Sequence, residues 1–305
     1  MSTAVPEPAG STPLIIDTDI GDDPDDTVAL VIAARTEPAL ALVVTSDERD
    51  GLRARFARQL LDRLGRSDVV VAAGAQIAPT GPGLCVQDLI DPDVARQTIE
   101  VAEAVAAVTE RSAGPVRWVG LGFLSNLAAL CEHRPDLVER LVVTQMGGAL
   151  GRDPSRPEFN FGGDPRATRT VLAEVTRPTL VVADLTYQAP MRVEPGSPLC
   201  TGLAGAGPGS WSHLVSEQFR AWFAIPKPSF QHDPLALSVA LGRGFVTFET
   251  ARIAVDEVGR MSLAADGAEV LLSRAVHYER FMAWLHEGLG LPAADDRTTE
   301  PLPSR

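Results

Sequence analysis

Residues 14–34 read LIIDTDIGDDPDDTVALVIAA, a stretch in which two apolar runs enclose six aspartates. The first run, Leu14–Ile16, is typical of a buried strand, and the second, from Val28, is typical of a helix. Asp23 is expected to cap this helix, with Pro24 at its first position, because both residue types favour these places. The stretch therefore predicts a strand, an acidic turn and a helix.

The acidic turn is unusually dense in carboxylates. Its members are Asp17, Asp19, Asp22, Asp23, Asp25 and Asp26. So many carboxylates repel one another at neutral pH, and a divalent cation would hold them together. Their hard oxygen atoms suit Ca²⁺ or Mg²⁺ better than zinc. The last two aspartates would also lie in the first helical turn, where the helix dipole favours negative charge. The alternative is that all six only solvate a turn and cap a helix.

Strand-like and helix-like segments alternate along the chain. The predicted strands are 14–16, 40–45, 69–73, 116–121, 141–146 and 180–185, and the helices between them are 25–34, 52–64, 125–131 and 165–175. This alternation predicts an α/β fold with a Rossmann-like, mostly parallel open sheet flanked by helices. After a glycine-rich connection, the pattern predicts a helix at 211–223, strands at 246–256 and 260–272, and a helix at 275–288. We expect one catalytic domain over residues 12–291, with flexible tails at 1–11 and 292–305.

The composition limits the possible functions. The chain has 305 residues, 45% of them hydrophobic, with a net charge of −13 and a mean hydropathy of +0.06. These values indicate a soluble protein and argue against nucleic acid as a partner. Residues 1–11 lack signal-peptide features, and no apolar run is long enough for a membrane span, so no membrane partner is expected. Three widely spaced cysteines show no metal-binding pattern and fit a reducing compartment, so we expect a cytoplasmic protein.

Four segments carry most of the chemistry-bearing side chains. They are IIDTDIGDDPDDTVAL at 15–30, GFLSNLA at 122–128, MGGALG at 146–151 with PEFNFGGDP at 157–165, and QHDPLAL at 231–237. The first three follow predicted strands, and sites in parallel sheets collect at the carboxyl ends of strands. Together, and in this order, the segments resemble the inosine–uridine-type nucleoside hydrolase family over residues 13–290.

The resemblance implies a Ca²⁺ ion bound by Asp19, Asp26, Asp233 and the main-chain carbonyl of Ser125. The 2′- and 3′-hydroxyls of a ribose would complete the shell, a mixed oxygen set of the kind that Ca²⁺ takes. The acidic turn is two residues longer than the commonest family form, which leaves open whether its two middle aspartates take part. The resemblance also implies a small nucleoside substrate and a homo-oligomer, either a dimer or a tetramer.

Further residues are expected to contact the substrate. Glu158 and Asn160 match the family's sugar-binding residues, and Met146 matches a residue that lines the pocket. Phe159 either packs or lines the sugar, and Trp222, with the neighbouring Phe223, either stacks on a base or belongs to the core. The candidate substrate-binding residues are Asp25, Asp47, Met146, Glu158, Phe159, Asn160 and Trp222.

The chemistry can be argued from the residue types. Cleavage of an N-glycosidic bond passes through an oxocarbenium-like state, which carboxylates around the sugar stabilise. Asp19 is the candidate base that takes the proton of a metal-activated water. His232 is the candidate acid that protonates the departing base, or else a buried structural histidine. Asn126 is expected to cap the helix after Leu124.

The sequence departs from the family in its sugar and base pocket. The turn after the second strand, Thr45-Ser46-Asp47-Glu48, lacks the usual Asn and Gly, so Asp47 would stand near the sugar as an acceptor. A second sugar-binding Asn is missing from residues 152–156, and residues 75–95 lack the usual flap sequence. Other readings are therefore a hydrolase of a modified ribosyl substrate or a metal-dependent sugar or nucleoside binder without turnover. A haloacid-dehalogenase-like phosphatase is less consistent, because the only lysine, Lys227, lies between two prolines.

Overall fold

The computed structural model describes residues 12–77, 84–151, 155–225 and 227–292, so the predicted tail at 1–11 and all of the predicted tail at 292–305 except Pro292 lie outside the described residues. Its central feature is a nine-stranded sheet in the order β10-β9-β11-β6-β5-β4-β1-β2-β3. The strands are β1 (Leu14–Thr18), β2 (Leu40–Thr45), β3 (Val70–Ala73), β4 (Val116–Gly120), β5 (Leu141–Met146), β6 (Thr179–Val181), β9 (Val246–Val255), β10 (Met261–Leu263) and β11 (Ala268–Val276). A separate two-stranded sheet pairs β7 (Arg192–Val193) with β8 (Ser229–Phe230).

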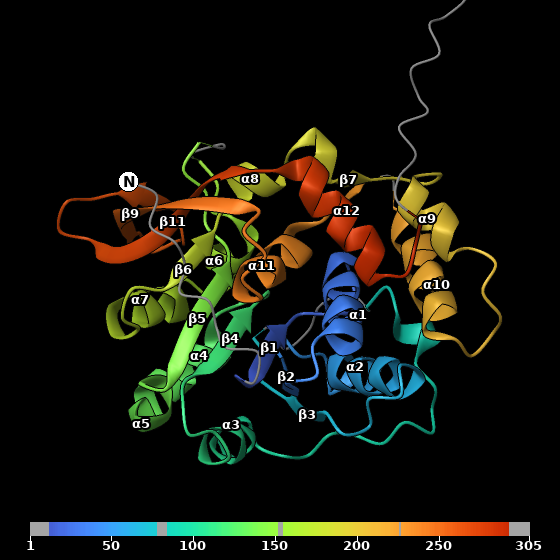
Figure 1. Cartoon of the computed structure of the whole chain (residues 1–305). Coiled ribbons are helices and arrows are strands. Elements are labelled where there is room, and N and C mark those ends of the chain that lie inside the picture. The colour runs from blue at the N-terminus through green and yellow to red at the C-terminus, as the bar shows by residue number, and fades with distance from the viewer. Residues whose placement is uncertain (1–11, 78–83, 152–154, 226, 293–305) are drawn as a thin grey trace, which may run out of the picture.

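Helices cover both faces of the sheet (Figure 1). They are α1 (Asp25–Thr36), α2 (Leu52–Arg63), α3 (Val101–Glu110), α4 (Ser125–His133), α5 (Pro135–Val138), α6 (Phe159–Gly163), α7 (Pro165–Glu174), α8 (Ala183–Thr186), α9 (Pro198–Leu203), α10 (Trp211–Phe223), α11 (His232–Ala240) and α12 (Tyr278–Gly288), with 3₁₀ turns η1 (Gln87–Leu89) and η2 (Ala189–Met191). One core cluster includes residues of α1, α2, α10, α11 and α12, and the other includes residues of α3, α4 and α7.

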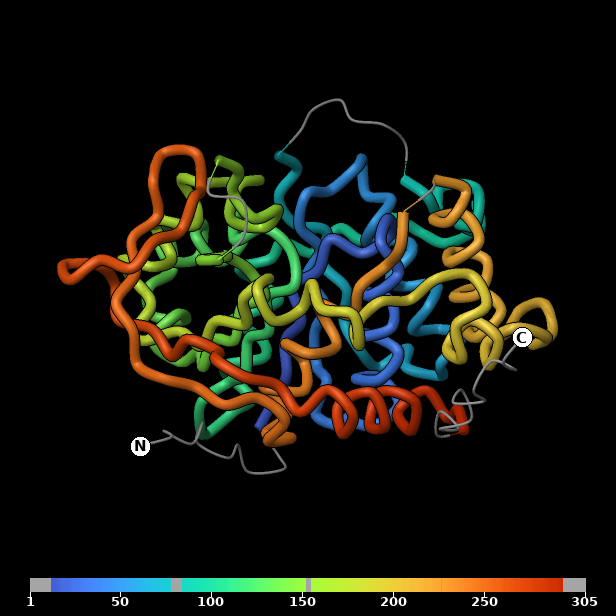
Figure 2. The backbone as a smooth tube through the Cα atoms, turned by 90° about the horizontal axis from the view of Figure 1, so that it is seen from above, coloured from blue at the N-terminus to red at the C-terminus, as the bar shows by residue number. Residues whose placement is uncertain are grey.

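The predicted fold class is confirmed. Seven strands, from β3 across to β11, run parallel, whereas β9 and β10 pair antiparallel at one edge. Figure 2 shows the loops of this edge, in orange, projecting from one side. Ile15 and Ile16 are fully buried in opposite core clusters, which is why β1 is continuously apolar rather than alternating.

Several element ends differ from the predictions. α1 begins at Asp25, the first residue of the predicted range, but Pro24 directly precedes the helix instead of occupying its first position, and the helix has no side-chain cap. The predicted cap, Asp23, instead accepts a hydrogen bond from the hydroxyl of Ser229 in β8. This long-range partner could not be foreseen from local capping preference.

In the C-terminal half of the chain, apolar runs led to two strand predictions with wrong bounds. The strand expected over 180–185 ends at Val181, because Ala183 starts helix α8. The strand expected over 260–272 is two strands, β10 and β11, joined by a turn, and β11 continues to Val276, so the last helix begins at Tyr278. Short apolar runs do not distinguish strand from buried helix. No described helix has the length and apolar character that crossing a membrane requires.

Candidate active site

The strand order reverses beside β1. From β1 the chain moves outward through β2 to β3, then returns to β4 on the other side of β1 and continues to β5 and β6. Ligands of open α/β sheets bind in the crevice outside the strand ends at such a point. The acidic turn leaves β1 here, and segment 122–128 leaves β4 here, so two of the four predicted segments meet.

Three buried carboxylates meet beyond the end of β1. Asp25 and Asp26 open α1, and Asp233 lies in the first turn of α11. One oxygen of each lies within 4.8 Å of the others, and the three residues are 3–4% exposed. Because α1 packs against α11, the backbone holds the three side chains together.

Burial and mutual repulsion raise the pKa values of these carboxyls. Burial, followed by the charge of Asp25, raises the pKa of Asp26 to about 7. Burial and neighbouring aspartates, Asp23 for the first and Asp25 for the second, raise the pKa values of Asp25 and Asp233 well above the usual range. Near neutral pH the cluster therefore needs protons or a compensating positive charge.

Asp19 lies beside this cluster. Burial and then the charge of Asp26 raise the pKa of its carboxyl well above the ordinary value. Its Oδ1 is 2.9 Å from the place that a Cβ on Gly122 would take, so the glycine permits this close approach. The resemblance grouped Asp19 with Asp26 and Asp233, whereas the close group of three in the described residues contains Asp25.

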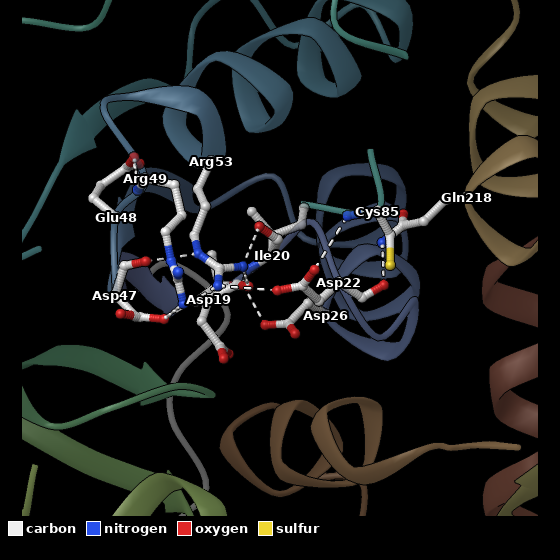
Figure 3. Close-up of polar contacts among 11 residues, drawn as sticks. Asp19, Ile20, Asp22, Asp26, Asp47, Glu48, Arg49, Arg53, Cys85 and Gln218 are labelled. Carbon is white, nitrogen blue, oxygen red and sulfur yellow. Dashed lines mark hydrogen bonds and ion pairs between the residues drawn. The ribbon is translucent and has the colours of Figure 1, made fainter. Parts of the chain in front are cut away.

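Arg53 fastens the acidic turn to the end of β2 (Figure 3). Its guanidinium donates to the carbonyls of Asp19 and Ile20, to the carboxylate of Asp22 at 3.2 Å and to the carbonyl of Asp47 at 2.9 Å. The side chain is only 2% exposed. Burial alone would lower the pKa of Arg53, but Asp19, Asp22 and Asp47 raise it above the ordinary value, so the group stays charged.

Asp47 was predicted to accept a hydrogen bond from the sugar. Two arginines compensate the charge of its carboxylate. Its Oδ2 lies 2.8 Å from Nη2 of Arg49 and 3.4 Å from Nη2 of Arg53. Its φ of +46° places it in the left-handed region. The next residue, Glu48, accepts a hydrogen bond from the Thr45 hydroxyl at 2.6 Å. The ion pairs of Asp47 with Arg49 and Arg53 were not among the predictions, and they commit one oxygen of Asp47.

Asn126 lies inside α4 and does not cap it, so that prediction is wrong. Its Nδ2 donates to Asp17 Oδ1 and to the Thr45 carbonyl, both at 3.0 Å, and its Oδ1 accepts from the Ala75 N–H at 2.8 Å. Burial raises the pKa of Asp17 to about 8, although the hydrogen bond from Asn126 opposes this shift. Asn126 thus ties the ends of β1 and β2 to the segment after β3.

His232 begins α11 beside the carboxylate cluster. Its Nδ1 lies 2.5 Å from the hydroxyl of Thr186. Its main-chain N–H donates to Asp25 Oδ2 at 3.1 Å. The rings of Tyr187 and Phe230 have centroids 4.5 and 5.8 Å from the imidazole. Two aromatic rings and a hydroxyl therefore surround the candidate acid.

The predicted sugar-binding residues make close backbone contacts. Glu158 accepts hydrogen bonds from three main-chain N–H groups, those of Gly148, Asn160 and Phe161. Burial raises the pKa of this carboxyl, and the backbone bonds oppose the shift. The Asn160 amide donates to the carbonyl of Met146 at 3.1 Å, and Met146 is 3% exposed. These contacts hold the segments after β5 and before α6 together.

Two predicted aromatic contacts occupy different environments. Phe159 is 67% exposed, and its ring lies 5.2 Å from that of Phe123. Trp222 is 7% exposed, donates its indole N–H to the Pro228 carbonyl, and has the Lys227 ammonium 3.4 Å above its ring. Burial of Trp222 corresponds to the core alternative of the sequence analysis.

Ser125, the predicted carbonyl ligand, is the first residue of α4. It is 7% exposed, and its hydroxyl donates to Asp164 at 2.7 Å. Its place after β4 puts it at the same crevice as Asp19.

Sequence reasoning missed five residues at the site. They are Arg49, Arg53, Thr186, Tyr187 and Phe230. The two arginines belong to no motif, and the Thr-Tyr pair directly follows a segment predicted as a strand, 180–185. The aromatic residue directly before QHDP was the one available signal, since it lies two positions from His232.

The donor set fits a divalent metal ion. Buried carboxylates with raised pKa values gain most from a nearby cation, and all the offered atoms are hard oxygens, which suit Ca²⁺ or Mg²⁺. Asp26 and Asp233, with Asp25 or Asp19, are the side chains that could hold it.

The sequence profile described as inosine-uridine preferring nucleoside hydrolase matches residues 14–283. The chain therefore belongs to this family of metal-dependent hydrolases, which act on N-glycosyl compounds. The resemblance seen in the sequence is thereby confirmed.

Curated relatives are similar to this chain in sequence, and solved structures are similar to it in fold. The pyrimidine-specific ribonucleoside hydrolase RihA of Shewanella woodyi is 32% identical over 58% of this chain and 62% of its own length. A plant nucleoside hydrolase structure superposes with a TM-score of 0.74 at 21% identity, covering 92% of this chain and all of that one. The effector protein XopQ, solved with adenosine diphosphate ribose, gives a TM-score of 0.68 at 20% identity, covering 93% and 94% of the two chains. These structural likenesses concern the fold.

Proposed function

We propose that this protein hydrolyses the N-glycosidic bond of ribonucleosides to free base and ribose, with Ca²⁺ as its metal ion. The observation that carries the proposal is the buried group of Asp25, Asp26 and Asp233 beside Asp19, with His232 next to Asp233 on α11. Family membership supports the reaction class, and the RihA relative supports ribonucleosides as the substrates.

Asp26, Asp233 and the main-chain carbonyl of Ser125, with Asp19, would hold the ion. A bound divalent cation would supply a site for the ribose hydroxyls and a more acidic water. Asp19 accepts a proton from the attacking water. Burial raises the pKa of its carboxyl, and a bound cation would offset this shift and keep the carboxylate ionised for that role. The surrounding carboxylates stabilise the positive charge that develops on the sugar in the transition state.

The other end of the substrate meets His232. This residue donates a proton to the departing base, and the Thr186 hydroxyl fixes its ring. Tyr187, 44% exposed, and Phe230 offer ring faces for the base, a role for which Trp222 is too buried. Asp25, Asp47, Met146, Glu158, Phe159 and Asn160 remain the proposed sugar contacts.

A panel of nucleosides tests the proposal. Free ribose should be released from at least one ribonucleoside, while a generic phosphate ester should yield no phosphate. Phosphate release without ribose release would instead support a phosphatase. Tight binding of a nucleoside without ribose release would support a binder that lacks turnover.

A second candidate is the hydrolysis of a modified ribosyl substrate. It is favoured by the altered turn after β2, where Arg49 and Arg53 bring two positive charges to the crevice. A protein of the same fold was solved with adenosine diphosphate ribose, a ribosyl compound that carries phosphates.

A further inference from the structure

The turn after β2 contains buried polar atoms without partners. Within the described part of the chain, Nε and Nη1 of Arg49 and Oδ1 of Asp47 are buried and make no hydrogen bond. Only Nη2 of Arg49 is engaged, at 2.8 Å from Asp47 Oδ2. Buried polar atoms nearly always find a partner, and unmet donors on a charged group are especially unfavourable.

The acidic residues nearby are already committed. Asp47 Oδ2 is shared with Arg53, and Asp22 pairs with Arg53. Glu48 accepts hydrogen bonds from the Thr45 hydroxyl and from a main-chain N–H of α2. Two guanidinium groups therefore share one carboxylate, and the charge of Arg49 is the less compensated of the two.

Arg49 stands on one flank of the proposed sugar site. β2 is the neighbour of β1, with Thr18 opposite Thr45, so the turn after β2 borders the acidic turn. Figure 3 shows the side chains of Arg49 and Arg53 extending side by side toward Asp47. Glu158 follows β5, which lies on the other side of β1 from β2. The positive charge of Arg49 and the carboxyl of Glu158 therefore lie on opposite sides of the proposed sugar site.

We propose that Arg49 binds a phosphate group and that this pocket selects phosphorylated ribosyl ligands. The inference rests on the proposed function and names its substrate class. Arginine suits the role because its planar fork donates several hydrogen bonds to phosphate oxygens. Asp47 then acts as the residue that orients the fork. An amide at this turn, as the family usually has, would hydrogen-bond a neutral sugar but could not balance a phosphate charge.

The test compares wild type with Arg49→Asn and Arg49→Lys. Arg96→Asn is the matched control, because Arg96 is an exposed arginine that pairs with Asp50 in the same turn. The substrates are uridine and its 2′-, 3′- and 5′-monophosphates, and kcat/KM is measured for each. Binding of ribose and of ribose 5-phosphate is measured separately by calorimetry.

Wild type should prefer at least one monophosphate to uridine. Arg49→Asn should lower kcat/KM for that ester by about 10- to 100-fold more than it lowers kcat/KM for uridine, as loss of a hydrogen bond to a charged group does. Arg49→Lys should retain part of the preference, and Arg96→Asn all of it. If free phosphate rather than an ester is the ligand, millimolar inorganic phosphate should change uridine turnover in wild type but not in Arg49→Asn.

Wild type that cleaves uridine at least as well as every monophosphate, with no effect of inorganic phosphate, would overturn the inference and leave the proposed function intact. Equal losses for uridine and its esters in Arg49→Asn would also overturn it. Absence of turnover with every substrate would refute the proposed function instead. In that case stronger binding of ribose 5-phosphate than of ribose, lost in Arg49→Asn, would still support the phosphate site.

Discussion

The main-chain N–H of His232 donates to the carboxylate of Asp25 at 3.1 Å, although 207 positions separate the two residues. The N–H of Asp233 donates to the same oxygen at 3.3 Å. Asp25 thus opens α1 and receives the first N–H groups of α11, which joins the two helices that supply the carboxylate cluster. A carboxylate can accept these bonds with one oxygen and offer the other to a ligand.

Removal of metal should make stability depend on pH in a defined direction. The pKa values in the folded state are about 7 for Asp23 and Asp26 and about 8 for Asp17, above their ordinary values. Raised carboxyl pKa values contribute stability at low pH that is lost as pH rises through the folded values. The melting temperature of metal-free protein should therefore fall between about pH 4 and pH 8.

Added Ca²⁺ should reverse that fall, because an ion that binds only the folded state stabilises it. Calorimetric melting curves at several pH values, with and without chelator, provide the measurement. A chelated protein, shown by elemental analysis to be free of metal, that melts at the same temperature as the loaded protein would contradict the metal centre.

Thr186→Val should weaken the proton donor. The substitution removes the hydroxyl that lies 2.5 Å from Nδ1 of His232 while keeping the shape of the side chain. We expect kcat for a natural nucleoside to fall by about 10-fold or more, and for a nitrophenyl riboside to change by less than about threefold, since that leaving group needs no proton. Thr186→Ser should restore most of the activity. Similar losses with both substrates would show that Thr186 only supports the fold.

Arg53→Lys should loosen the acidic turn without removing charge. The variant keeps a cation but loses the fork that reaches the carbonyls of Asp19 and Ile20. Residues that orient metal ligands typically contribute about 10- to 100-fold to metal affinity or activity, and we expect losses of this size in Ca²⁺ affinity and in kcat. Calcium titration and steady-state kinetics measure them.

The control for this variant is Arg117→Lys. Arg117 is also buried and pairs with Glu37 at 3.1 Å, but it lies near the start of β4, at the opposite end of the sheet. The Arg117→Lys variant should be less stable than wild type, while its Ca²⁺ affinity stays within about twofold of the wild-type value. Equal losses of Ca²⁺ affinity in the two variants would refute a positioning role for Arg53.

Ribosides should be strongly preferred to 2′-deoxyribosides. A site that hydrogen-bonds a hydroxyl rejects a substrate without it, because the buried partner is left unpaired. With Asp25 buried at 3% exposure, we expect at least about a 10²-fold difference in kcat/KM between uridine and deoxyuridine. Comparable kcat/KM values for uridine and deoxyuridine would show that the 2′-hydroxyl does not contact Asp25.

Local sequence patterns were sufficient for the fold and for part of the site. Continuous apolar runs such as Leu14–Ile16 identified strands buried on both faces, and DDTVAL and HDP identified the carboxylates that meet. The close set of three contains one oxygen of Asp25, whereas the resemblance implied Asp19 as the third side chain, and that grouping stays a prediction.

Contacts between distant segments could not be read from the sequence. Arg53 bonds to Asp19 across 34 positions, and Thr186 contacts His232 across 46. Such pairs arise from strand order and helix packing, which local propensity and spacing do not encode. Asn126 shows the same limit, because its position favoured a cap while its amide was recruited by Asp17.

The central claim is that the buried aspartates hold a metal ion required to cleave ribonucleosides. It is tested most directly by measuring free ribose released from uridine by protein that is stripped of metal, analysed for metal content, and then reloaded with Ca²⁺. We predict that release is lost on stripping, returns on reloading, and does not return in Asp26→Asn or Asp233→Asn. Undiminished ribose release by protein proven free of metal would contradict the account.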